Sequence, residues 1–230
     1  MPNGYMGKIL WVNLSDETFK EEELSDEIYR QYLGGYGLAT KLIYENMPAK
    51  ADALSPDAIL GFFPGLLTGT VSPLSGRFMV AGKSPLTGTW GDANCGGYFG
   101  PQVKKCGYDA ILVKGAARNP KIIAIIDDDK QILDASDLWG LDAVQTEDKL
   151  AEKYGRVQVA SIGQSGEKLS LISGIVNDKA RLAGRSGFGA IMGSKKLKAI
   201  VLKGNKDISV ANKDSLLNLT KEYNDAIAKG

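Results

Sequence analysis

Glycines and arginines stand close together in the segment from Ala180 to Lys203, which reads ARLAGRSGFGAIMGSKKLKAIVLK. They are Arg181, Gly184, Arg185, Gly187 and Gly189. Glycine lacks a Cβ atom, so its backbone can approach a ligand closely. A guanidinium group offers a fixed fork of N–H donors to an anionic or phosphorylated ligand, and helix amides after the glycines would add a positive partial charge. These residues predict an anion-binding turn, although a glycine-rich turn with two solvated arginines fits them equally well.

A fainter copy of this segment lies 89 residues earlier in the chain. At that offset three dipeptides are identical: Phe99-Gly100 with Phe188-Gly189, Ala110-Ile111 with Ala199-Ile200, and Lys114-Gly115 with Lys203-Gly204. Both copies read as a glycine turn, a short helix, a buried strand and a glycine. Similarity at a fixed offset indicates a duplicated structural unit. We therefore expect two glycine turns that face each other and hold one pseudo-symmetric ligand.

The composition excludes several classes of protein. A length of 230 residues allows one large domain or two small ones. A net charge of +1 gives no electrostatic support for binding to nucleic acid or to an anionic membrane. No apolar run is long enough to span a bilayer, and the first residues lack the basic and apolar regions of a secretory signal. A cytoplasmic location is therefore expected.

Histidine is absent from the sequence, and cysteine occurs twice. The absence excludes serine–histidine and cysteine–histidine nucleophile pairs and histidine metal sites within this chain. Cys95 and Cys106 are spaced for neither a zinc knuckle nor an iron–sulfur motif, so two reduced thiols are expected. No catalytic residue is predicted in this chain. Any chemistry must come from a cofactor or from another polypeptide.

Strands and short helices alternate along the chain, which predicts an α+β fold. Apolar patterns and turn residues predict strands over residues 8–13, 18–23, 59–63, 77–83, 108–114, 121–126, 131–133, 157–162, 169–176 and 199–202. Cap and stop signals predict helices over residues 27–33, 36–46, 101–106 and 143–154. Residues 90–100, WGDANCGGYFG, are expected to form a functional loop. The acidic residues 127–129 lack the spacing of a calcium loop and are expected to form a solvated turn.

The chain becomes polar after Gly204. Asn212 can cap a helix that continues to Lys229. The apolar side chains of that helix, including Leu216 and Tyr223, fall on one face and need a surface to pack against. We therefore divide the chain into a domain over residues 1–204 and the start of a further domain over residues 205–230.

Four blocks of sequence carry a resemblance to a known family. They are GRFMVAGKSPLTG (76–88), ANCGGYFGPQVKKCGYDAILVKG (93–115), DASDLWG (134–140) and NDKARLAGRSGFGAIMGSKKLKAIVLKG (177–204). From about Gly7 to Gly204 the chain resembles the N-terminal domain of tungsten-containing aldehyde:ferredoxin oxidoreductases. The resemblance implies two β-sheets with pseudo-two-fold duplication. It also implies that they form the base for a bis-pyranopterin cofactor of tungsten, or of molybdenum, which takes the same ligands.

The resemblance also implies roles for individual residues. Arg77 would contact the pterins. Asn94 and Leu182 would offer backbone carbonyls to a magnesium ion shared by the pterin phosphates. The other cofactor-lining positions are Gly96, Arg181, Gly184 and Arg185. Two positions depart from the family pattern: Leu182 stands where alanine is common, and Cys95 replaces a frequent serine.

The implied enzyme oxidises an aldehyde to a carboxylic acid and passes two electrons through a 4Fe-4S cluster to ferredoxin. The cluster and the proton-transfer residues belong to later domains or to a partner subunit, so this chain alone is expected to be inactive. The resemblance allows a homodimer. Two alternatives stay open: a non-catalytic module for pterin binding or assembly, and a relative that acts on another substrate, such as an acyl-CoA ring or a sugar-phosphate aldehyde.

Overall fold

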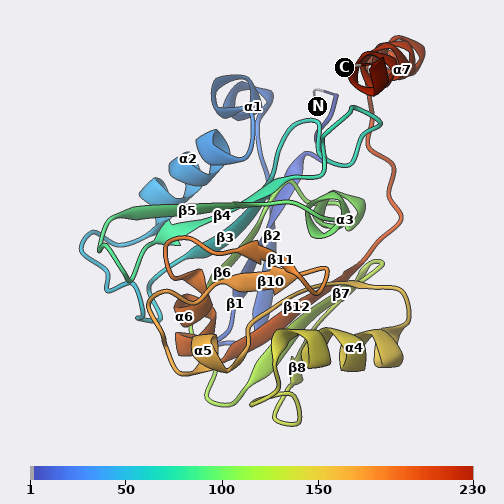
Figure 1. The fold of residues 1–230 in the computed structure, drawn as a ribbon. Helices are drawn as coiled ribbons and strands as arrows, with labels where there is room; N and C mark the ends of the chain where they lie inside the picture. Colours follow the sequence, from blue (N-terminus) through green and yellow to red (C-terminus); the bar gives the residue numbers. More distant parts are fainter. Residues whose placement is uncertain (1–2, 230) are drawn as a thin grey trace.

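The computed structural model describes residues 3–229, which form two six-stranded β-sheets with helices between and outside them (Figure 1). The first sheet has the order β2-β1-β6-β3-β4-β5. Its strands are β1 (Lys8–Asn13), β2 (Thr18–Glu23), β3 (Leu60–Pro64), β4 (Phe78–Lys83), β5 (Trp90–Cys95) and β6 (Ile111–Lys114). The second sheet has the order β11-β10-β9-β12-β7-β8. Its strands are β7 (Lys121–Ile126), β8 (Asp129–Asp134), β9 (Gln158–Ser161), β10 (Ile175–Asn177), β11 (Arg181–Ala183) and β12 (Leu197–Lys203).

The two sheets repeat one topology. In each, the first and last strands in sequence (β1 with β6, and β7 with β12) pair in parallel, and every other neighbouring pair is antiparallel. The strand order of the second sheet matches that of the first when it is read from the opposite end. The chain therefore folds as two repeats, of which the first contains β1–β6 and the second β7–β12. The α+β fold with a duplicated sheet, predicted from the sequence, is confirmed.

Helices cover both outer faces and fill the gap between the sheets. They are α1 (Asp26–Tyr32), α2 (Tyr36–Asn46), α3 (Phe99–Lys105), α4 (Ala143–Tyr154), α5 (Gln164–Glu167), α6 (Phe188–Ser194) and α7 (Lys213–Lys229). The largest core cluster lies between the sheets, where α3 and α6 insert equivalent phenylalanines, Phe99 and Phe188. The first sheet packs α1 and α2 on its outer face, and the second packs α4 (Figure 1). The short helices predicted at offset 89 are thus present as α3 and α6, and their phenylalanines pack in the core between the sheets.

Two predicted elements differ from the structure by more than a few residues at their ends. Residues 90–95 of the expected loop form β5, whose six residues all pair with β4. Glycine, aspartate and asparagine are rare in strands, but this ladder outweighs their low propensity. The strand predicted over residues 169–176 begins only at Ile175, because α5 and serine turns occupy the preceding chain. A Cβ atom at Gly193 would overlap the carbonyl of Gly166, so α5 and α6 pack backbone against backbone there.

The last helix, α7, projects from the body at the end of an extended connector (Figure 1). None of its described residues is buried. The predicted cap is present, since the Asn212 side chain accepts from the backbone N–H of Ser215 at 2.9 Å. The connector itself is fastened to both repeats: Lys206 pairs with Asp128 at 2.8 Å, and the carbonyl of Ser209 accepts from Gly4 N–H at 2.6 Å. The acidic turn is thus a solvated turn with one lysine partner.

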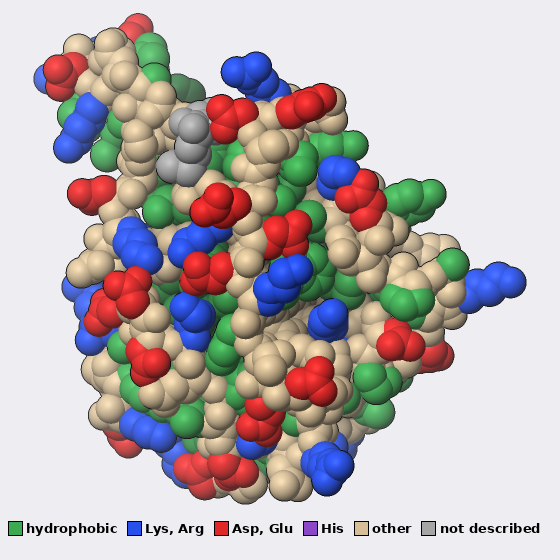
Figure 2. Space-filling model, turned by 180° about the vertical axis from the view of Figure 1, so that it is seen from behind, with side chains coloured by type: hydrophobic (Ala, Val, Ile, Leu, Met, Phe, Trp, Pro, Cys, Tyr) green, Lys and Arg blue, Asp and Glu red, His purple; other side chains and the backbone are tan. Residues whose placement is uncertain are grey.

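The charged side chains on one face of the molecule are not separated by sign. Acidic and basic side chains are mixed over the face that Figure 2 shows. No helix in residues 3–229 is both long and apolar enough to cross a membrane. Over the same residues, no three acidic or cysteine side chains are grouped as ligands for a metal ion.

Two buried lysines, Lys104 and Lys195, donate hydrogen bonds only to backbone carbonyls. Lys104 donates to Gly4 and Leu66, both at 2.6 Å, and Lys195 donates to Pro56 and Gly115 at 3.3 and 3.0 Å. Burial lowers the pKa of each ammonium group to about 8. The unfolded chain keeps these protons up to a pKa of about 10.4.

Between about pH 8 and 10 the unfolded chain keeps protons that native Lys104 and Lys195 release, so these two lysines make the free energy of unfolding rise with pH. The buried thiols of Cys95 and Cys106 oppose this rise, because burial raises their pKa values and they keep their protons in the native state. The rise is at most about 1.4 kcal/mol per pH unit for each lysine. Urea unfolding of Lys104→Met across this range should give a slope below the wild-type slope by up to about 1.4 kcal/mol per pH unit. Lys213→Met, at an exposed lysine, should keep the full slope. An undiminished slope in Lys104→Met would contradict the account.

Candidate cofactor-binding site

The registers of the two sheets relate the candidate residues to one another. Starting from Ile111 and Ile200, which the sequence matched, three ladders lead to Ala93 in β5 and to Arg181 in β11, and the next residue along each strand is Asn94 or Leu182. These two positions are therefore structurally equivalent, and Gly96 and Gly184 each follow two residues later. The sequence offset here is 88 instead of 89, so a comparison at one fixed offset cannot find this equivalence. The two backbone carbonyls that the resemblance assigned to one ion stand at matching sites of the repeats.

Two guanidinium groups from different repeats converge on Gly96. Arg77 immediately precedes β4, whereas Arg181 opens β11. A Cβ atom built at Gly96 would lie 3.4 Å from Nη1 of Arg181 and 3.5 Å from Nη1 of Arg77. Both arginine side chains are exposed. Two exposed positive charges around an accessible backbone favour a ligand with more than one negative charge.

Asn94 holds Arg77 in place. The Arg77 Nε donates to the side-chain Oδ1 of Asn94, and Nη2 donates to its backbone carbonyl at 3.2 Å. A carbonyl oxygen has two lone pairs, so the Asn94 carbonyl keeps the capacity to bind a second partner. The side chain of Asn94 thus orients an arginine while its backbone stays open to a ligand.

Leu182 fits without displacing its surroundings. Its side chain is 54% exposed. Its methyl groups lie 2.7 and 2.8 Å from the positions where Gly174 and Gly184 would carry Cβ atoms. Glycine at both positions makes the room that the larger side chain needs. The leucine side chain therefore packs against Gly174 and Gly184, in the space that their missing Cβ atoms leave.

Arg185 lies beside a polar group that the sequence reasoning missed. It is exposed and acts electrostatically on Tyr36, whose hydroxyl donates to Asp92 at 3.2 Å. Partial burial raises the pKa of Tyr36, and the Asp92 carboxylate raises it further. Trp90 Nε1 donates to the same carboxylate at 3.3 Å. The positive charge of Arg185 lowers the pKa of Tyr36, so Arg185 acts across the junction on a residue of the first repeat.

A hollow of about 730 Å³ adjoins Arg77 and Asn94. Its walls are the loop over residues 33–37 and the loop over residues 65–75. Sequence reasoning treated Gly34 and Gly35 only as the end of a helix. Three glycines within residues 34–37 were the signal that could have identified a ligand-facing turn. The site is therefore larger on the side of the first repeat than the sequence indicated.

Cys95 lies beneath the site as a packed thiol. It is 2% exposed and free, and Asn177 Nδ2 donates to its sulfur at 3.0 Å. Burial raises the pKa of the Cys95 thiol. Cys106 is also buried and free, and burial raises its pKa to about 12. Both cysteines are inert thiols at neutral pH, as the prediction of two reduced cysteines requires.

The residue following Gly96 shows how closely the two repeats approach. Gly97 has φ +110°, and a Cβ atom there would lie 2.5 Å from Asn177 Oδ1 and 2.8 Å from Arg181 Cδ. It would come closer still to the carboxylate of Asp178. The turn after β5 thus lies directly on the turn between β10 and β11, and all these contacts cross from one repeat to the other.

The donor set fits a large anionic cofactor. Arg77, Arg181 and Arg185 are exposed, the backbone at Gly96 and Gly184 is accessible, and the adjoining hollow can take an extended group. All seven residues predicted for the site come from the ends of β4, β5 and β11 or the turns beside them. The structure therefore brings these residues to one junction between the repeats.

Comparisons with known proteins show which family model and which relatives this chain resembles. The family model described as "Aldehyde ferredoxin oxidoreductase, N-terminal domain" matches residues 9–204. The tungsten-containing aldehyde ferredoxin oxidoreductase of Pyrococcus horikoshii is 46% identical over 228 residues, which are 98% of this chain and 38% of that protein. The aliphatic sulfonate oxidoreductase, WOR-like subunit, of Pyrococcus furiosus is 28% identical and covers 95% of this chain and 38% of its own.

A solved structure supports the same fold. The active-site complex of a benzoyl coenzyme A reductase, in complex with 1,5-dienoyl-CoA, superposes with a TM-score of 0.96 and 32% identity. The match covers 100% of this chain and 35% of that one. This chain therefore spans well under half the length of the relatives it matches.

Gly97→Ala is expected to destabilise the protein by about 2 kcal/mol or more, because the new Cβ atom meets three neighbours and φ is positive. Chemical unfolding measures the loss. Gly163→Ala is the matched control, since its Cβ atom would meet nothing closer than 3.7 Å and its φ is −93°. A wild-type stability for Gly97→Ala would show that the repeats are not in contact at this turn.

Proposed function

Because the chain belongs to the aldehyde ferredoxin oxidoreductase family as its N-terminal domain, we propose that it forms the base for a bis-pyranopterin tungsten cofactor in an aldehyde-oxidising enzyme. The observation that carries this proposal is the convergence of Arg77 and Arg181 on the backbone of Gly96. The relatives that match over nearly the whole chain are tungsten-containing by name. When bound, the cofactor would supply oxygen-transfer and redox chemistry at the metal.

The residues of this chain would bind and orient the cofactor. Arg77 would direct its guanidinium group, oriented by Asn94, at one pterin, and Arg181 would act in the same way from the second repeat. The backbone carbonyls of Asn94 and Leu182 would bind a magnesium ion at their equivalent positions. Gly96, Gly184 and Arg185 would complete the surface by close approach and charge. In this role none of these groups would take a proton from the substrate.

The catalytic residues and the path for electrons would lie in the remainder of the protein. The relatives are longer than this chain, so they contain further domains. We propose that residues 205–230 begin the next domain, and that the exposed apolar face of α7, with Leu217, Leu219, Tyr223 and Ile227, packs against it. A 4Fe-4S cluster, ferredoxin as electron acceptor, a cytoplasmic location and a homodimer belong to the same proposal.

A second candidate function has specific support. The benzoyl coenzyme A reductase complex matches the fold with a TM-score of 0.96, and that structure holds 1,5-dienoyl-CoA. The same base domain could therefore serve a relative that acts on an acyl-CoA ring. Assay of the full-length holoenzyme with short aldehydes and with aromatic acyl-CoA esters distinguishes the two candidates. Binding of pterin without either activity would favour the module for binding or assembly.

Arg77→Ala in the full-length protein is expected to lower tungsten per chain several-fold, because a charge-assisted contact to the cofactor is lost. Elemental analysis after anaerobic purification measures the metal. Arg118→Ala, at an exposed arginine outside the site, serves as the control and should keep wild-type tungsten. If Arg77→Ala retains full tungsten content, the assignment of this surface to the cofactor fails.

A further inference from the structure

The turn between β10 and β11 places one carboxylate at the junction of the repeats. Asp178 and Lys179 in this turn both have positive φ, of 45° and 60°. Aspartate is among the few residues other than glycine that tolerate this region. The Asp178 carboxylate accepts from the backbone N–H of Tyr98 at 2.9 Å and lies 3.7 Å from Nε of Arg181. Its side chain is only 19% exposed.

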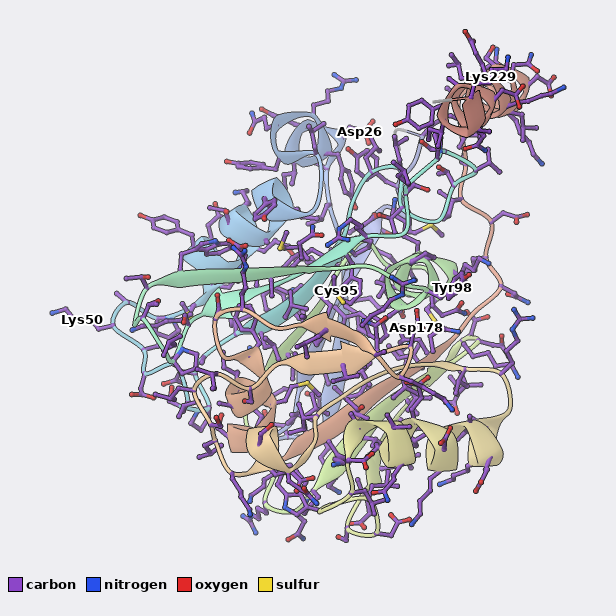
Figure 3. The ribbon with its side chains drawn as sticks, in the orientation of Figure 1. Asp26, Lys50, Cys95, Tyr98, Asp178 and Lys229 are labelled. Atoms are coloured by element: carbon purple, nitrogen blue, oxygen red, sulfur yellow. The ribbon has the colours of Figure 1, made fainter. Side chains whose placement is uncertain are left out.

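These contacts join the two halves of the site. Tyr98 belongs to the turn after β5 in the first repeat, whereas Arg181 opens β11 in the second. Figure 3 labels Cys95, Tyr98 and Asp178, which lie together between the two sheets. One carboxylate thus holds the backbone next to Gly96 and, at the same time, an arginine that converges on Gly96.

The turn between β10 and β11 is also held by α4 of its own repeat. Lys179 donates its backbone N–H to Glu147 at 2.9 Å and its side chain pairs with Asp148 at 2.5 Å, both on α4. Asn177 donates to Cys95 across the junction. Asp178 therefore projects from a turn that is anchored to its own repeat and reaches the other. This placement makes it a rigid support for the groups that it contacts.

The other repeat has no matching carboxylate. By the strand registers, Val80 is equivalent to Asn177, so the position equivalent to Asp178 is Ala81, which is buried within β4. At the offset of 88, Ser186 is the counterpart of Tyr98. Its contact with the first repeat involves no charged group, because Ser186 Oγ donates to the backbone carbonyl of Asp92 at 3.2 Å. The duplication alone does not produce Asp178. It is an addition to one side of a nearly symmetric site.

We propose that Asp178 is the positioning residue that sets the two arginines of the site relative to each other. It fixes the turn at residues 96–98 by the Tyr98 hydrogen bond and directs the Arg181 side chain through the ion pair. It also offsets part of the repulsion between Arg77 and Arg181, whose guanidinium groups lie around one glycine. The proposal rests on the proposed function, because the ligand that the arginines receive is the anionic cofactor.

The test uses the full-length holoenzyme, purified anaerobically, with Asp178→Ala and Asp178→Asn. Two quantities are measured: tungsten per chain, and hydrogen exchange of the peptide that contains Tyr98. In Asp178→Ala the Tyr98 amide should exchange about tenfold faster, since its charged acceptor is gone. Tungsten should fall several-fold while the unfolding temperature stays near that of the wild type. Asp137→Asn, at an exposed aspartate of the same repeat, should change neither quantity.

The asparagine variant separates positioning from general structural support. Its amide oxygen can still accept from Tyr98, so slow exchange should return, whereas tungsten content should recover only in part because the negative charge beside Arg181 is missing. It also decides the question if Asp178→Ala does not fold. Wild-type tungsten content and wild-type exchange in Asp178→Ala would overturn the proposal, and so would full tungsten content in Asp178→Asn.

The proposed function can fail independently. A wild-type holoenzyme without tungsten or pterin would refute the cofactor assignment. The exchange of Tyr98 in Asp178→Ala would still report whether the carboxylate fixes the junction, and unchanged exchange there would overturn the positioning role by itself.

Discussion

The close approach of β5 and β11 at the junction of the two repeats is the constraint on which the site depends. A Cβ atom at Gly97 would overlap the opposite turn, and one at Gly91 would lie 2.8 Å from Cβ of Ser186. Because these positions are glycine, the edge strands of two separate sheets can share one surface. That surface brings together arginines that are more than 100 positions apart in the chain. Without this contact, each repeat would present a glycine turn and an arginine, but no common site.

The two repeats have equivalent backbone at the site but differ in their side chains. Asn94 and Leu182 occupy equivalent places, as do the glycines that follow them, so the two repeats offer matching backbone to a pseudo-symmetric ligand. The side chains differ: asparagine orients Arg77, whereas leucine packs over Gly174 and Gly184. Equivalent buried positions also differ in charge. Asp109, held by Tyr29 and by backbone N–H groups, corresponds at offset 89 to Lys198, which pairs with Glu167 at 2.5 Å. The repeats thus share a backbone plan but have diverged in their polar groups.

Features that depend on residues close together in the sequence were predicted, whereas features that depend on distant contacts were not. The glycine turn at Gly184–Gly189, the hairpin of β1 and β2 and the helix α4 depend on residues close together, and their patterns predicted them. The loop predicted over residues 90–100 was wrong at residues 90–95, because the residues of β5 have low strand propensity and only the distant pairing with β4 stabilises the strand. Asp178 and the hollow beside Arg77 were missed because they arise where loops from different repeats meet. The family resemblance supplied the site residues that lie far apart, and periodicity alone could not have grouped them.

In the proposed function, a metal-bearing cofactor would lie over the edge formed by β5 and β11, where both repeats contribute an arginine. Anomalous X-ray diffraction from crystals of the full-length holoenzyme, recorded on both sides of the tungsten LIII edge, tests this directly. The account predicts one strong anomalous peak per chain over this edge, on the side of Gly96 that the two guanidinium groups face. A tungsten peak remote from both arginines would show that the junction of the repeats has another purpose.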